Sequence, residues 1–232
     1  MSIRNNYKHT LTASYFGYIT QAIVNNFAPL LFVTFQRSFG ISLEKIAGLV
    51  TVNFFMQLVV DLASAKFIDR IGYRASIVAA HLFAGAGLIM LGTLPFALPD
   101  PYIGLLISIG FYAVGGGLIE VLISPIVEAC PTDKKSAAMS LLHSFYCWGH
   151  VAVILLTTLF FVTAGIKNWH FLAYLWAIIP FANAVYFCLV PINSLTAEGG
   201  AAPMKELFKS KLFWILAVLM VCSGASEQAM SQ

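Results

Sequence analysis

The sequence predicts an all-α polytopic membrane protein, and its composition and its long apolar runs are the basis for this prediction. Of 232 residues, 59% are hydrophobic and 10% are charged, and the mean hydropathy is +0.85. Soluble domains carry roughly 25% charged residues, so the composition argues against a water-soluble globule. The net charge of +3 is spread in small clusters, which argues against a nucleic-acid-binding stripe. The four cysteines lie far apart and predict neither a disulfide framework nor a metal site.

Seven apolar runs are each long enough to cross a bilayer, which takes ~20 residues of helix. The first is too long for the apolar region of a signal peptide, so we expect it to stay as a membrane helix. None alternates with period two as a membrane β-strand does. In chain order, the runs cover residues 11–35, 46–67, 77–98, 102–129, 138–164, 169–190 and 212–232.

Lysine and arginine predict the orientation of these helices. With the N-terminus in the cytoplasm, 10 of the 13 basic residues fall on the cytoplasmic side, and Arg37, Lys45 and Lys167 fall outside. This bias is the positive-inside rule, and it indicates a cytoplasmic N-terminus. We expect a multi-pass protein of the plasma membrane. We therefore expect a six-helix bundle over residues 1–190, a cytoplasmic loop over 191–210, and helix seven over 211–232.

Polar side chains inside membrane helices are costly and mark functional sites. They gather in the helices that open each group of three, whereas the third and sixth helices are nearly bare. Two inverted three-helix repeats around a central site would give this distribution, and chance is the alternative. The candidates are Gln21, Asn25 and Asn26 in the first helix, Asn53, Gln57 and Asp61 in the second, Glu120 in the fourth, His143 in the fifth, and Glu227 in the seventh.

The segment between the second and third helices carries a recognisable motif. Residues 65–74 read AKFIDRIGYR, which resembles the loop signature G-x-L-x-D-R-x-G-R-[KR] of the major facilitator superfamily. Asp69, Arg70, Gly72 and Arg74 match it, while positions 65 and 73 depart from it. Gly72 supplies the backbone freedom that a short turn needs. The resemblance implies a major facilitator six-helix bundle, in which this loop is a cytoplasmic gate.

A narrower resemblance lies in the fourth helix. Residues 115–125 read GGGLIEVLISP and are similar to the fucose permease branch of sugar:proton symporters, as are residues 142–146 and 224–227. The resemblance implies that Glu120 faces the cavity and binds a proton or the substrate. That branch also has an aspartate in the first helix, where this chain has Asn25 and Asn26. Either Glu120 couples alone, or Asp61 contributes, or protons are not coupled.

The implied function is a secondary active transporter that moves a small polar solute, a sugar, by proton-coupled symport with alternating access. Neutral amides donate and accept hydrogen bonds, as a polyhydroxylated solute requires, although amides also join membrane helices to one another. A structural pair with His143 is the alternative role for Glu120. The alternative function is a major facilitator efflux carrier (antiporter) for drugs or metabolites, and a membrane enzyme or receptor is remote. We expect no enzyme activity, cofactor or metal.

The length implies an incomplete site. A complete carrier of this superfamily has twelve helices, with its cavity between two bundles. This sequence would supply one bundle and the first helix of the second, and we expect it not to transport alone. Its expected partners are the solute and H⁺, the lipid bilayer and the missing C-terminal bundle, with no nucleic acid.

Overall fold

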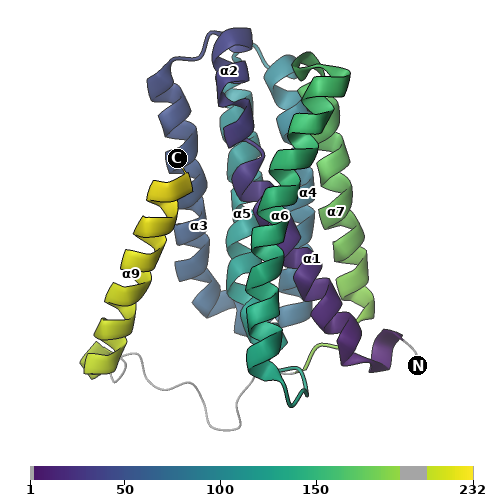
Figure 1. Ribbon diagram of the computed structural model, residues 1–232, viewed down its shortest axis with the longest axis vertical. Helices are drawn as coiled ribbons and strands as arrows, with labels where there is room; N and C mark the ends of the chain where they lie inside the picture. The colour runs from purple at the N-terminus through teal and green to yellow at the C-terminus, as the bar shows by residue number, and fades with distance from the viewer. Residues whose placement is uncertain (1–2, 194–207, 232) are drawn as a thin grey trace. The chain divides into compact units, whose positions relative to one another are not determined.

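The computed structural model describes residues 3–193 and 208–231. The chain divides into two units, Met1–Leu195 and Thr196–Gln232. Every regular element within the described ranges is a helix (Figure 1). The all-α prediction is therefore confirmed.

Six helical segments of the first unit are long and apolar enough to cross a membrane. They match the first six predicted runs. The second unit has one described helix, α9 (Lys211–Ser231), where the seventh run was predicted. The helices of the first unit are α1 (Tyr7–Asn26), α2 (Phe32–Phe39), α3 (Leu43–Ile71), α4 (Tyr73–Ala97), α5 (Pro101–Glu128), α6 (Lys135–Ala164) and α7 (Trp169–Leu189), with 3₁₀ turns at Ile3–Asn5, Pro29–Leu31 and Ile166–Asn168.

Polar caps explain why several helices begin before their apolar runs. The Asn6 side chain accepts a hydrogen bond from the backbone N–H of Lys8 at 3.0 Å, and Asp100 does the same for Tyr102 at 2.9 Å. Such caps satisfy amide groups that have no partner within the helix.

A single residue, Gly72, separates α3 from α4, with φ 91° and ψ 146°. This positive φ confirms the need for glycine in the turn.

The first span is broken, although the sequence predicted one run over 11–35. α1 ends at Asn26, a 3₁₀ turn begins at Pro29, and α2 follows. Proline has no N–H to donate to the carbonyl four residues earlier, which here belongs to Asn25. Beyond the break, Phe35 packs edge-on against Trp169, with ring centroids 5.4 Å apart. The part of the span that follows the break thus packs against the start of α7.

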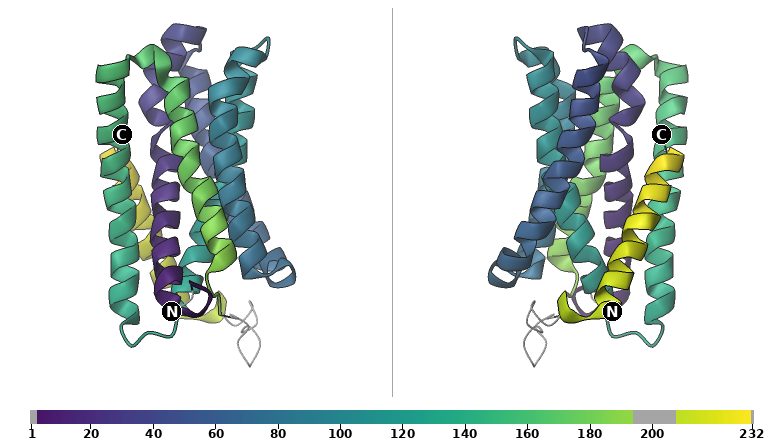
Figure 2. Two further views of the ribbon diagram at one scale, coloured as in Figure 1. Left: turned by 90° about the vertical axis from the view of Figure 1, so that its right-hand side faces the viewer. Right: turned by 90° about the vertical axis from the view of Figure 1, so that its left-hand side faces the viewer.

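The helix contacts follow a two-fold pattern. α1 contacts α6 and α7, and α5 contacts α3 and α4. If the first span is exchanged with the fourth, the second with the fifth and the third with the sixth, the contacts of α1 become those of α5. The α1–α5 and α4–α7 contacts are unchanged by this exchange. Figure 2 shows α6 running alongside α1. These contacts are those expected of two three-helix repeats.

Exposure differs among the spans of the first unit. The third and sixth spans are α4 and α7. They pack against each other, and the least buried spans are α3 and α6. Large apolar side chains are exposed on both, including Leu62 at 73% and Leu155 at 63%. α4 and α7 are joined by a buried polar pair, which is described below.

Candidate functional site

Three consecutive glycines on α5 allow three other helices to approach it closely. A Cβ atom on Gly115 would lie 2.5 Å from the backbone nitrogen of Ala84 in α4. On Gly116 it would lie 3.2 Å from Gln21 Oε1 of α1, and on Gly117 it would lie 3.1 Å from the Cα of Gln57 in α3. These distances are too short for any side chain larger than that of glycine without a shift of the neighbouring atoms. They bring the polar side chains of α1 and α3 against α5.

Amide side chains of α1 and α3 form a hydrogen-bonded group beside these glycines. Gln57 Nε2 donates to Asn25 Oδ1 at 2.9 Å and to Asn53 Oδ1 at 3.3 Å. Gln57 and Asn53 are buried, and Asn25 is half-buried. We call Asn25, Asn53 and Gln57 the amide network. The structure therefore brings together three of the predicted binding residues, and Gln21 lies beside them at Gly116.

Glu120 bonds the glutamine that lies beside the amide network. Gln21 Nε2 donates to Glu120 Oε2 at 3.4 Å. Gln21 is only 3% exposed, whereas Glu120 is exposed in this unit. A buried amide thus connects to a carboxyl group that the first unit leaves exposed.

Two hydroxyl groups that the sequence analysis missed extend this region. The Tyr18 hydroxyl lies 3.0 Å from Ser124 Oγ, at hydrogen-bonding distance. Tyr18 precedes Gln21 by about one helical turn and Ser124 follows Glu120 by one turn, so helical spacing was the signal that could have revealed them. The predicted His143 on α6 is exposed, and its ring lies 5.6 Å from that of Tyr18.

An aromatic surface joins α1 to α6 next to Tyr18. The rings of Tyr15 and Phe145 stack with centroids 4.7 Å apart and planes 2° from parallel. Trp148 packs edge-on against Phe145 at 5.2 Å and is 57% exposed. A flat, accessible indole beside polar groups is suited to the apolar face of a sugar ring.

The remaining predicted site residues lie apart from these hydrogen bonds. Asn26 Nδ2 donates to the Ala22 carbonyl of its own helix at 2.8 Å. Asp61 lies one turn beyond Gln57 and is half-buried, and its Oδ1 has no hydrogen-bond partner among the described residues. The side chain of Glu227 lies outside the described residues.

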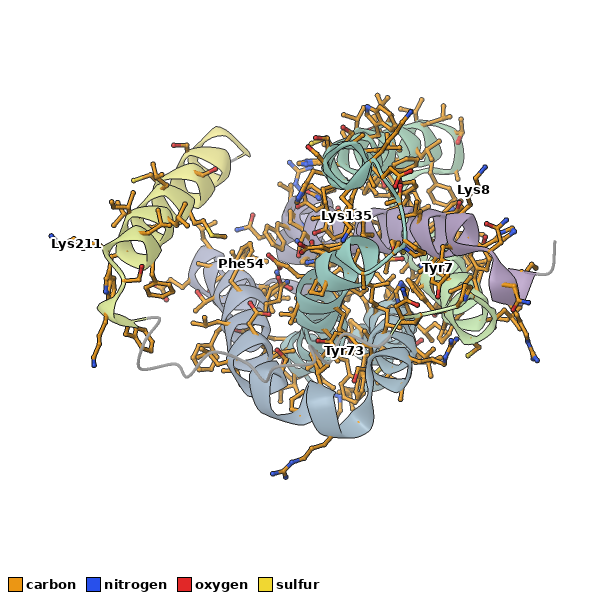
Figure 3. The ribbon with its side chains drawn as sticks, turned by 90° about the horizontal axis from the view of Figure 1, so that it is seen from below. Tyr7, Lys8, Phe54, Tyr73, Lys135 and Lys211 are labelled. Carbon is orange, nitrogen blue, oxygen red and sulfur yellow. The ribbon has the colours of Figure 1, made fainter. Side chains whose placement is uncertain are left out.

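The predicted gate motif lies at the end of the unit where α1 begins (Figure 3), which we call the N-terminal end. Arg74 Nη1 donates to the carbonyls of Phe187 at 2.8 Å and Cys188 at 3.2 Å, so it caps the last turn of α7. Arg70 is exposed, Gly72 forms the turn, and the side chain of Asp69 is not among those described. Whether this loop acts as a gate stays a prediction.

Further contacts close the N-terminal end. The Tyr7 hydroxyl donates to Asn193 Oδ1, and Asn193 Nδ2 donates to the Ala129 carbonyl at 2.8 Å. Thr10 Oγ1 donates to the Pro191 carbonyl at 2.5 Å. The segment after α7 is therefore bonded to the beginning of α1 and the end of α5.

A second polar cluster lies in the middle of the helix bundle. Asn183 Nδ2 of α7 donates to His81 Nε2 of α4 at 2.9 Å and to the Ala13 carbonyl of α1 at 3.0 Å. Because His81 Nε2 accepts, Nδ1 carries the proton and donates to the Ile77 carbonyl at 2.8 Å. His81 is 0% exposed and Asn183 4%. We call this pair the buried clamp, since it joins three helices without reaching solvent.

The chain matches a known protein family over nearly its whole length. The family model described as Major Facilitator Superfamily matches residues 14–232. No curated protein matches the chain. Among the described residues, no three histidine, cysteine, aspartate or glutamate side chains are grouped so that they could hold a metal ion.

Proposed function

Because the chain belongs to the major facilitator superfamily, whose members are membrane transporters and not enzymes, we propose that it serves proton-coupled symport of a small polar solute, specifically a sugar. Transport proceeds by alternating access across the plasma membrane, with the N-terminus in the cytoplasm. The chain is a multi-pass membrane protein with six membrane-length helices in its described residues. The resemblance of residues 115–125 to the fucose permease branch supports the sugar and the proton.

The observation that carries this proposal is the contact of Gln21 with Glu120, which links an exposed carboxyl group to a buried amide that lies beside the amide network. An ionised carboxylate can only accept hydrogen bonds, whereas a protonated one can also donate. Protonation of Glu120 would therefore change which solute hydroxyl groups it can bind. Asn25, Asn53 and Gln57 supply further donors and acceptors, and Trp148 supplies an apolar face.

A second six-helix bundle would complete the site in this proposal. Glu120 is exposed in the first unit, and an ionisable side chain facing lipid is costly. The large exposed apolar side chains of α3 and α6, such as Leu62 and Leu155, provide surface for such a bundle. The amide network and Trp148 would then line a cavity between the two bundles.

The experiment is Glu120→Gln in a transporter that contains both bundles, reconstituted in proteoliposomes. Proton-driven accumulation of a labelled sugar should be lost, because glutamine cannot load and release a proton. Exchange of sugar across the membrane should persist, because the amide still forms hydrogen bonds. Glu128→Gln, two turns along α5 and exposed, is the matched control and should accumulate normally.

Two other results would redirect the proposal. If Glu120→Gln still accumulates sugar while Asp61→Asn does not, Asp61 is the coupling group. If an inward proton gradient drives solute out of the vesicles, the protein is an antiporter and the symport proposal is wrong.

A further inference from the structure

Gln21 occupies an unusual position between the amide network and Glu120. Its side chain is only 3% exposed, and one end of its amide, Nε2, donates to Glu120. The other end, Oε1, is buried and has no hydrogen-bond partner among the residues that the structure describes. An unsatisfied buried oxygen costs free energy, so this orientation of the amide needs a compensating gain.

A negative charge on Glu120 would supply this gain. A carboxylate accepts hydrogen bonds, and a bond from an amide N–H to a charged acceptor is stronger than one between neutral groups. When Glu120 takes up a proton from water, its hydroxyl becomes a donor and the Gln21 N–H is no longer the better partner. Rotation of the amide by half a turn then offers Oε1 to the new donor.

The rotation would also reach the amide network. Gln21 Oε1 and Gln57 Nε2 lie on the same side of α5, 3.2 Å and 3.5 Å from the Cβ position above Gly116. If the Gln21 amide turned, its N–H groups would face the Gln57 N–H groups that now bond Asn25 and Asn53. Two donors cannot bond each other, so Gln57 would have to rearrange.

We propose that Gln21 is a positioning residue that reports the protonation state of Glu120 to the amide network by turning its side-chain amide. This inference rests on the proposed function, because it assumes that Glu120 is the proton site. Its consequence is that proton binding changes the donors and acceptors that Asn25 and Asn53 present to the solute.

Other titratable groups on α5 and on the helices packed against it must be distinguished from Glu120. Those along the middle of these helices are Tyr15 and Tyr18 on α1, Asp61 on α3, His81 on α4, Tyr112 on α5, and His143, Tyr146, Cys147 and His150 on α6; those near the helix ends include Tyr7, Lys8 and His9 on α1, Glu44 and Lys45 on α3, Tyr73 and Arg74 on α4, Tyr102 and Glu128 on α5, and Lys135 on α6. A spectroscopic signal that is specific for a carboxyl group and assigned by Glu120→Gln separates Glu120 from all of them.

The test is an infrared titration of the chain in lipid nanodiscs, which needs no transport. The carbonyl stretch of protonated Glu120 is the band that Glu120→Gln removes. Donation from Gln21 stabilises the carboxylate, so its loss in Gln21→Met should move the midpoint of this band up by about half to one pH unit. Gln21→Asn keeps an amide but shortens it, and should move the midpoint in the same direction. Gln36→Met, the same change on α2, should leave it in place.

Each outcome decides a separate point. An upward shift in both Gln21 variants, but not in Gln36→Met, supports the inference. An unchanged midpoint in Gln21→Met, with the band still removed by Glu120→Gln, overturns the role of Gln21 and leaves the proposed symport standing. If no titrating band disappears in Glu120→Gln, then Glu120 does not change protonation, and both the inference and the proton coupling through Glu120 are wrong.

Discussion

The buried clamp and the amide network use similar side chains for different ends. In the clamp, His81 and Asn183 are almost completely buried and bond to backbone carbonyls of α4 and α1. In the amide network, the side chains bond one another, and beside it Gln21 bonds the exposed Glu120. Backbone acceptors are fixed in place, whereas side-chain amides can turn. A polar cluster inside a membrane bundle therefore stabilises the fold in one case and remains able to rearrange in the other.

The adjacent glycines Gly115 and Gly116 test this comparison with the largest expected effect. In Gly115→Ala, the new Cβ would meet the backbone of α4 at 2.5 Å and 2.6 Å. We expect a loss of about 3 kcal/mol in unfolding free energy, because packed backbone cannot yield easily. In Gly116→Ala, the neighbours are the side chains of Val24 and Gln21 at 3.1 Å and 3.2 Å, and we expect a loss of about 1 kcal/mol.

Unfolding of both variants in detergent gives the comparison, with Gly110→Ala as the control, since a Cβ there meets no atom within 4 Å. Equal losses at Gly115 and Gly116 would mean that the two sides of α5 are equally rigid.

Removal of the clamp amide should have the next largest effect. Asn183→Leu leaves the buried His81 Nε2 without a donor, and we expect a loss of about 1–2 kcal/mol in unfolding free energy. The double variant His81→Leu/Asn183→Leu should lose less than the sum of the single changes, because no polar atom of the pair remains unsatisfied. The midpoint of the Glu120 titration should not move in Asn183→Leu. A shift would show that the two clusters are coupled.

Thiol labelling extends the comparison to the N-terminal end. It measures the access of reagent to single cysteines, and we expect its effect to be the smallest of these predictions. Cys130 is 2% exposed, and burial raises its pKa to about 11. Because burial disfavours the thiolate, almost all of Cys130 stays protonated until the pH approaches that value. In variants that keep one cysteine each, maleimide at pH 7.5 should leave Cys130 unlabelled and should label the exposed Cys188. Denatured protein should label at both positions, and equal labelling in the native protein would mean that this end is open.

The sequence predicted the helices well because span-length apolar runs are a strong signal. It placed their ends less accurately, since polar caps such as Asn6 and Asp100 and the break at Pro29 depend on local hydrogen bonds. It selected the amides of α1 and α3 by their cost in a membrane. It did not predict the contact of His81 with Asn183, because 102 positions separate them and only packing reveals the pair. Tyr18 and Ser124 escaped notice because hydroxyl groups carry a weak signal in apolar helices.

The capping of α7 by Arg74 constrains the order of events during biosynthesis. The two carbonyls that Arg74 bonds lie 113 and 114 residues further along the chain. The ribosome has therefore already synthesised α4, α5 and α6 before these acceptors exist. Until then the guanidinium must be solvated by water or lipid headgroups. The N-terminal end of the first unit is thus completed last, when its sixth span enters the bilayer.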